Sequence, residues 1–134
     1  MVEHVVRADA TSPEDWTSTA FGHLDIRSLI SEARQNSKKA MVGQTIYLPG
    51  STHEHRLHPE AEEVVIVMSG HGWHRVGANH YDIGPGDIVF IPVNAPHSAG
   101  SEPDETMTIL WILGGAPSLE KAGYEAVDEI PRVP

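Results

Sequence analysis

Cysteine is absent from the 134 residues of this chain, and that absence removes several kinds of chemistry. The chain can form no disulfide, and it offers neither a thiolate metal ligand nor a cysteine nucleophile. Histidine and the carboxylates remain as the strong metal-binding side chains. Any metal site in this protein therefore has nitrogen and oxygen ligands.

Basic residues and long apolar runs are also scarce. Nine lysines and arginines stand against 19 acidic residues, which gives a net charge of −10 at pH 7. This charge repels nucleic acid phosphates and anionic membrane surfaces, so we expect neither as a partner. No apolar run is long enough to cross a bilayer, and the acidic start of the chain does not suit a secretory signal. We expect one compact domain over residues 1–134, located in the cytoplasm.

Short apolar or alternating segments, separated by Gly/Pro turns, occupy the middle of the chain. Residues 41–48 alternate with a period of two, and residues 63–68 form a β-branched run; further strand patterns cover 73–77, 80–92 and 106–113. About six short strands at this spacing predict an all-β sandwich or barrel. Residues 1–39 are expected to form an N-terminal arm, in which 24–35 suit either a strand or a short helix, and 114–134 a polar tail.

Histidine is the unusual component. Three of the nine histidines, His53, His55 and His58, fall within six positions. An isolated histidine would be interpreted as an exposed loop residue, but this clustering favours a metal site. Glu63 begins an apolar run, so that if it faces inward with Val65 and Val67 its buried charge needs a cation.

Two segments resemble the metal motifs of the cupin superfamily. From Gly50 to Gly70 the chain resembles the first motif, which has a glycine, an H-x-H pair, a glutamate and a glycine. In this register His58 and Glu63 match the second histidine and the glutamate, whereas Arg56, which cannot ligate a metal, stands at the first histidine. Residues 84–97 resemble the second motif, where His97 matches the last ligand and Asn94 replaces a glycine.

The resemblance implies a cupin-type double-stranded β-helix, a jelly-roll barrel with its metal motifs at about residues 50–100. It also implies one divalent transition metal: zinc, iron, manganese or nickel. A β-bulge at His55, or reach from the preceding strand end by His53, would replace the missing ligand. Glu63 would be a ligand or an orienting group. The candidate metal ligands are His53, His55, His58, His97 and Glu63.

In its small size, its extra histidines and its segment LGGAPSLEKAGY (113–124), the chain resembles the single-domain cupin cyclases that fold aromatic polyketide chains in antibiotic biosynthesis. The resemblance implies a lyase-type enzyme that cyclises a poly-β-ketone by metal-assisted acid and base chemistry. The expected catalytic residues are His55, Glu63 and His97, and the expected substrate-pocket residues are Gln44, Arg56, Trp73 and Trp111, with His74 as a further candidate for the cavity wall.

Two other functions are compatible with the same sequence. A non-haem iron dioxygenase would use nitrogen and oxygen ligands with open positions for oxygen. A non-catalytic cupin would use its metal only to anchor a small molecule. In each case we expect a small-molecule partner and a homodimer, because a one-domain barrel exposes strand edges and an apolar outer sheet face.

Overall fold

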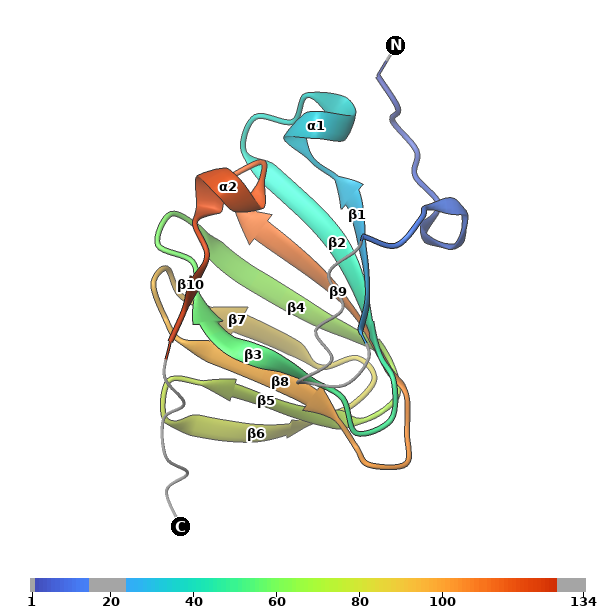
Figure 1. Ribbon diagram of the computed structural model, residues 1–134, viewed down its shortest axis with the longest axis vertical. Coiled ribbons are helices and arrows are strands. Elements are labelled where there is room, and N and C mark those ends of the chain that lie inside the picture. The colour runs from blue at the N-terminus through green and yellow to red at the C-terminus, as the bar shows by residue number, and fades with distance from the viewer. Residues whose placement is uncertain (1, 15–23, 128–134) are drawn as a thin grey trace.

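The computed structural model describes residues 2–14 and 24–127, which form two antiparallel sheets facing each other (Figure 1). Sheet A has the order β1-β2-β9-β4-β7, with bounds Leu24–Ile30, Ala40–Tyr47, Met107–Gly114, Glu62–Ser69 and Ile88–Ile91. Sheet B has the order β10-β3-β8-β5-β6, with bounds Glu125–Ala126, Thr52–Leu57, His97–Ser101, Gly72–Val76 and Asn79–Ile83. The predicted all-β jelly-roll barrel is confirmed.

Alternation along the strands decides which side chains fill the space between the sheets. In β4 the inward side chains of Glu63, Val65 and Val67 are buried, as expected, whereas their neighbours are more exposed. The same period of two runs through β2 and β9. The core between the sheets is mainly aliphatic and includes Ile91, Met107, Ile109 and Leu113.

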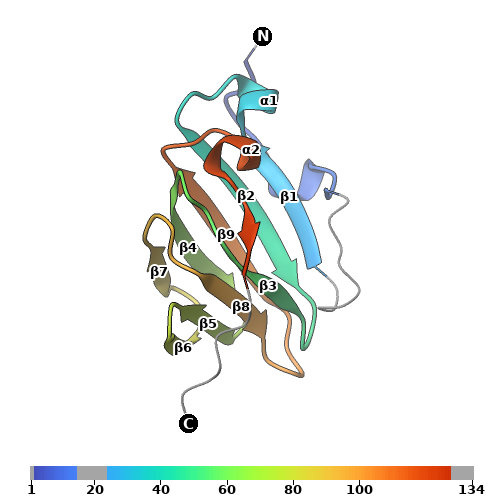
Figure 2. The same cartoon turned by 60° about the vertical axis from the view of Figure 1, so that its left-hand side comes forward.

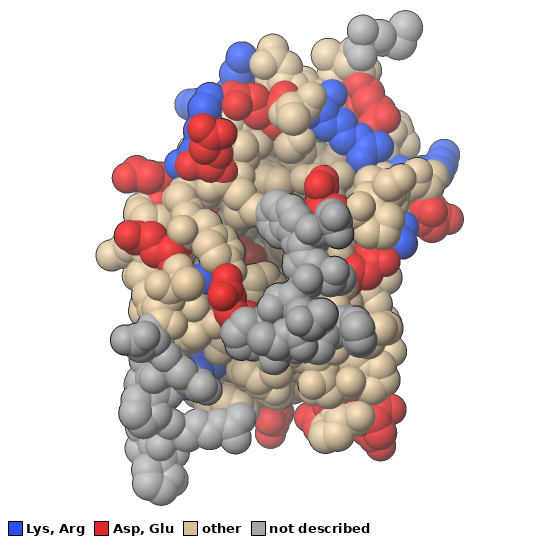
Figure 3. Space-filling view, viewed as in Figure 1, with Lys and Arg blue, Asp and Glu red and all other residues tan. Residues whose placement is uncertain are grey.

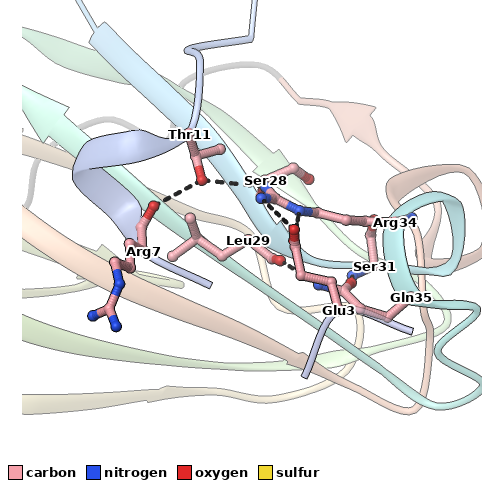
Figure 4. A network of polar contacts seen from close by, with 8 residues as sticks. All are labelled: Glu3, Arg7, Thr11, Ser28, Leu29, Ser31, Arg34 and Gln35. Atoms are coloured by element: carbon pink, nitrogen blue, oxygen red, sulfur yellow. Dashed lines mark hydrogen bonds and ion pairs between the residues drawn. The ribbon is translucent and has the colours of Figure 1, made fainter. Parts of the chain in front are cut away.

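The first described residues are tied to sheet A. Residues 24–35 contain both a strand, β1, and a single helical turn, α1 (Glu32–Gln35), capped by Ser31. Arg34 pairs with Glu3 at 2.6 Å and donates to Thr11 Oγ1 and to the carbonyl oxygen of Ser28, which anchors the N-terminal segment (Figure 4). The expected arm over residues 1–39 therefore contributes an edge strand from Leu24; a 3₁₀ turn at Ala8–Ala10 precedes it.

The C-terminal segment folds back onto the mouth of the barrel. Helix α2 (Leu119–Ala122) follows β9, and β10 then adds to the edge of sheet B beside β3 (Figure 2). Gly123, with φ of 79°, joins them where an added Cβ would lie 2.7 Å from Pro59 Cδ. Only glycine suits this conformation and this close contact. The described part of the predicted tail is thus a component of the barrel.

The surface agrees with the acidic composition. Acidic side chains are spread over the face shown in Figure 3, whereas lysine and arginine gather mainly near α1, α2 and the N-terminal turn. Among the described helices, none has the length and apolar character needed to span a membrane.

Candidate metal centre

Three buried side chains from different strands converge at one end of the barrel interior. His58 follows β3, Glu63 lies in β4 of the opposite sheet, and His97 begins β8. Glu63 Oε1 lies 3.5 Å from His58 Nε2 and 3.1 Å from His97 Nε2. All three residues are at most 5% exposed. Their ligand atoms lie within 4.8 Å of one another, as a shared metal ion requires.

Backbone contacts fix the orientation of both imidazoles. His58 Nδ1 donates to the carbonyl oxygen of Gly123 at 2.8 Å, and His97 Nδ1 donates to that of Ala95 at 2.9 Å. With Nδ1 held by the backbone, each ring turns its Nε2 toward Glu63. Neither Glu63 Oε1 nor His97 Nε2 finds a hydrogen-bond donor in the described part of the chain. Three buried acceptors that face one another fit a cation.

The charge states favour the same conclusion. Burial alone would raise the pKa of Glu63, but the imidazoles of His58 and His97 and the charge of Arg56 outweigh it and lower the pKa. Burial and then the charge of Arg56 lower the pKa of His97, against the opposing effect of Glu63. At neutral pH the cluster therefore offers an ionised carboxylate and a neutral imidazole, which are the forms that bind metal ions.

A β-bulge in β3 decides which histidine faces the interior. His53 pairs with Ala99, and Arg56 pairs with His97, so three steps on β3 oppose two on β8. The extra residue turns both His53 and Arg56 into the cavity, although their positions in the sequence have opposite parity. His55, predicted as a metal ligand and catalytic residue through such a bulge, does not line the cavity and is outside the metal cluster. The bulge exists, but the side chain that it brings inward is Arg56.

Next to the metal cluster, the barrel interior contains a pocket that opens to solvent. Sheet A supplies a mainly apolar wall, whereas sheet B supplies the imidazole rings of His53 and His74 and the guanidinium of Arg56. Trp111 Nε1 donates to Thr45 Oγ1 at 3.0 Å, which fixes the indole against the wall. The lining residues are Ile26, Thr45, Tyr47, His53, Arg56, His58, Glu63, Val65, His74, Ile109, Trp111, Leu113, Leu119 and Tyr124.

Two predicted pocket residues lie elsewhere. Gln44 is on the outer face of β2, because the inward positions of that strand are Gly43 and Thr45. Trp73 also does not line the cavity: its ring stacks on His80 with centroids 5.3 Å apart and covers Gly100. Both side chains lie away from the cavity because successive residues of a strand face opposite sides of the sheet. Arg56 and Trp111 do line the cavity.

Other cavity groups were weakly signalled by the sequence or not at all. His74 is 1% exposed, and burial, followed by the charges of Arg56 and His97, lowers its pKa to about 3. The alternation of β5 is the signal that finds it. Tyr124 reaches the cavity only because the C-terminal segment folds back, and its hydroxyl donates to Glu54. His53 lines the same wall but is outside the metal cluster, and burial lowers its pKa well below the usual value.

Comparisons with known proteins agree with this architecture. The sequence model of the cupin domain family matches residues 43–113. The polyketide cyclase RemF from Streptomyces resistomycificus is similar in structure, with a TM-score of 0.78 and 19% identity over 97% of this chain and 88% of that one. A predicted oxalate decarboxylase from Thermotoga maritima has a TM-score of 0.74 and 20% identity over 83% of this chain and 98% of that one. No curated protein sequence matches the chain. At these identities the structural likeness shows the fold.

Proposed function

The chain belongs to the cupin domain family, and from that premise we propose that it is a metal-dependent enzyme that cyclises a poly-β-ketone by aldol chemistry. The observation that carries the proposal is the set of three buried acceptors, His58, Glu63 and His97, beside a cavity with an apolar wall. The similarity to a polyketide cyclase over almost the whole chain supports this choice within the family.

The metal would be held by His58, Glu63 and His97. When bound, a divalent ion would supply the Lewis acidity that polarises a ketone oxygen and makes the neighbouring methylene more acidic. The aliphatic residues of sheet A and Trp111 would hold the carbon chain in a folded conformation and keep water away. This wall would decide which methylene meets which carbonyl.

Proton transfer falls to the histidines of sheet B that line the cavity. His53 and His74 line the cavity and are uncharged at neutral pH, because burial lowers their pKa values. Burial also makes them weak bases, so either would act on a methylene that its two neighbouring carbonyls already make acidic. One of them would take the methylene proton. The carbanion would attack a second carbonyl carbon, and the imidazolium would return its proton to the new alkoxide. Loss of water would then aromatise the ring. His55, the residue first expected in this role, does not line the cavity.

Metal analysis tests the proposal directly. The protein should be purified anaerobically without a tag, analysed by mass spectrometry for bound metals, and assayed after each metal is removed and added back. We expect one ion per chain, and we expect a redox-silent ion such as zinc to restore cyclisation. A protein that binds no metal, or cyclises equally well without it, would overturn this function.

A second function is favoured by one specific feature. Two histidines and one carboxylate are the ligand set of non-haem iron enzymes that use oxygen. If only iron restores activity, and if substrate turnover consumes oxygen, the protein is a dioxygenase acting on a small organic molecule. Zinc and iron add-back in the same assay separate the two functions.

We also propose that the protein is a cytoplasmic homodimer. Support for the dimer comes from apolar side chains on the outer side of sheet A and on its edge strand β7: Met68, Ile88 and Phe90 are each at least half exposed. A second copy of the chain would cover them. Light scattering at micromolar concentration should give twice the mass of the chain, and a monomeric mass would contradict the dimer.

A further inference from the structure

Arg56 stands where the resemblance to the family leads one to expect a metal ligand. The bulge in β3 turns this side chain inward, opposite His97, and leaves it 7% exposed on the cavity wall. The guanidinium donates to the carbonyl oxygen of Glu54 at 3.1 Å. It is a permanent positive charge, because arginine does not lose its proton in proteins.

Arg56 differs from two other arginines in having no carboxylate in direct contact among the residues that the structure describes. Arg27 pairs with Asp25 at 2.9 Å, and Arg34 pairs with Glu3 at 2.6 Å. Within residues 2–14 and 24–127, by contrast, no aspartate or glutamate forms an ion pair with Arg56. Among the described residues, Glu63 offsets the charge of Arg56 through space and not by direct contact. The guanidinium can therefore still form a direct ion pair with an anion from outside the chain.

The charge of the whole cavity favours the same kind of ligand. Among the described lining residues, Arg56 and Glu63 are the ones with opposite fixed charges, and they balance each other. A divalent metal on His58, Glu63 and His97 would leave the cavity net positive. Protonation of a histidine would only add to that charge. An anionic group on the ligand restores neutrality.

The opposite wall defines the rest of the ligand. Val65, Ile109 and Leu113 face the cavity from sheet A together with Trp111, whose ring is held by Thr45. These surfaces suit a hydrocarbon or an aromatic ring. The polar and apolar walls belong to different sheets, so the anionic and apolar parts of the ligand would lie against opposite sides.

We propose that Arg56 binds a carboxylate of the substrate, so that the enzyme acts on an amphipathic acid whose apolar body lies along Trp111. The reactive β-carbonyl part of that acid rests on the proposed function, whereas the carboxylate subsite rests on Arg56 alone. The planar guanidinium can bind both oxygens of a carboxylate at once, which a lysine cannot do.

Ligand binding to metal-free protein tests this subsite independently of catalysis. The probes are 3-phenylpropanoate and its neutral analogue 3-phenylpropanamide, titrated by calorimetry at low salt into protein stripped with a chelator and into the same protein after zinc is added back. The stripped protein tests Arg56 without a metal, and the reloaded protein tests it in the cavity expected to be net positive. We expect the acid to bind at least about tenfold more tightly than the amide, because one bidentate ionic contact distinguishes them. Equal affinities, or no binding of either probe, would overturn the proposal.

Variants identify the residue responsible. Arg56→Gln should remove the preference for the acid, and the matched control Arg34→Gln, which removes an arginine outside the cavity, should keep it. Arg56→Lys retains the charge without the planar fork and should keep a weaker preference, which also covers the case in which Arg56→Gln fails to fold. A preference that survives Arg56→Gln would overturn the assignment.

The same data separate this inference from the proposed function. Acid binding that depends on Arg56 in a protein that takes up no metal would leave the subsite standing and remove the cyclase. Metal uptake and cyclisation together with equal affinity for acid and amide would remove the carboxylate subsite and leave the cyclase standing.

Discussion

The inner faces of the two sheets follow the same alternation but have different chemistry. From sheet A come Val65, Ile109, Trp111 and Leu113, and from sheet B come three histidines and an arginine: His53, His74, His97 and Arg56. The wall from sheet A is mainly apolar, with Glu63 as its ionised residue, whereas the wall from sheet B carries imidazole rings and a guanidinium. The difference shows that a small barrel can divide packing and chemistry between its two sheets.

Small residues on β8 make the polar wall possible. This strand has the sequence HSAGS, and every residue in it is buried. Ala99 lies between His53 and His74 in one cross-strand row, so the two rings flank a methyl group instead of a bulky side chain. Sheet A instead interlocks large residues, and the indole of Trp111 lies directly over Gly43. Each wall would be damaged by a change that the other tolerates.

The largest effect on the cluster is expected from removing the carboxylate of Glu63, the ionised residue that sheet A contributes. Glu63→Gln should lower metal affinity by at least about a hundredfold, more than the loss of a group that only supports a ligand. Competition titration with a chromophoric chelator measures it. Glu62→Gln, next in sequence but exposed, is the matched control and should bind normally. Wild-type affinity in Glu63→Gln would show that the carboxylate is not a ligand.

The packing wall is tested at Gly43. A Cβ added there would lie 2.0 Å from Trp111 Cζ2, so Gly43→Ala must push the indole into the cavity. We expect the free energy of unfolding to fall by about 1–3 kcal/mol, measured by urea denaturation. In Gly114→Ala, the control on β9, the nearest contact is 3.4 Å, to the flexible side chain of Glu62. Equal stability of Gly43→Ala and wild type would contradict this packing.

Lowering the pH should reduce the stability of the folded protein, because the histidines of the polar wall are buried in the neutral form. The pKa of His74 in the folded protein is about 3, below its ordinary value of 6.5, so the unfolded chain binds protons more readily. The stability that this histidine contributes is complete above pH 6.5 and is lost as the pH falls toward 3, by up to about 1.4 kcal/mol per pH unit. In metal-free protein, urea midpoints from pH 7 to 4 should fall less steeply for His74→Gln. Parallel pH profiles would contradict the inward position of His74.

The smallest effect is expected at His55. Because the bulge turns Arg56 inward and leaves His55 off the cavity wall, His55→Ala should bind metal with unchanged stoichiometry and affinity. The measurement is the same chelator competition as for Glu63. A clear loss of affinity would mean that β3 presents His55 to the metal, with a register different from the one described.

Much of the fold and part of the site were predictable from sequence. The period of two in residues 41–48 and 63–68 corresponds to β2 and β4, and Glu63 faces inward with Val65 and Val67. His58 and His97 were found by their positions in the two motifs, and the structure brings their rings within 3.5 Å of Glu63. Local pattern succeeds here because each strand alternates regularly over the residues concerned.

Three side chains expected at the site, those of Gln44, Trp73 and His55, do not line the cavity. Local sequence could not show this, because which face of a strand points inward depends on pairing with strands distant in sequence. Tyr124 is brought to the cavity by a glycine turn and a two-residue strand at the end of the described chain. No local pattern in that polar segment predicts its return to β3.

The sequence by itself determined that this is an all-β barrel without thiol chemistry, with histidine and carboxylate as its metal-binding groups. These properties follow from residue types and from the period of two, which act locally. Only the tertiary structure decided that Arg56, and not His55, faces the cavity, and that the polar and apolar walls belong to different sheets. Those outcomes depend on one extra residue opposite β8 and on strand register, which long-range pairing alone fixes.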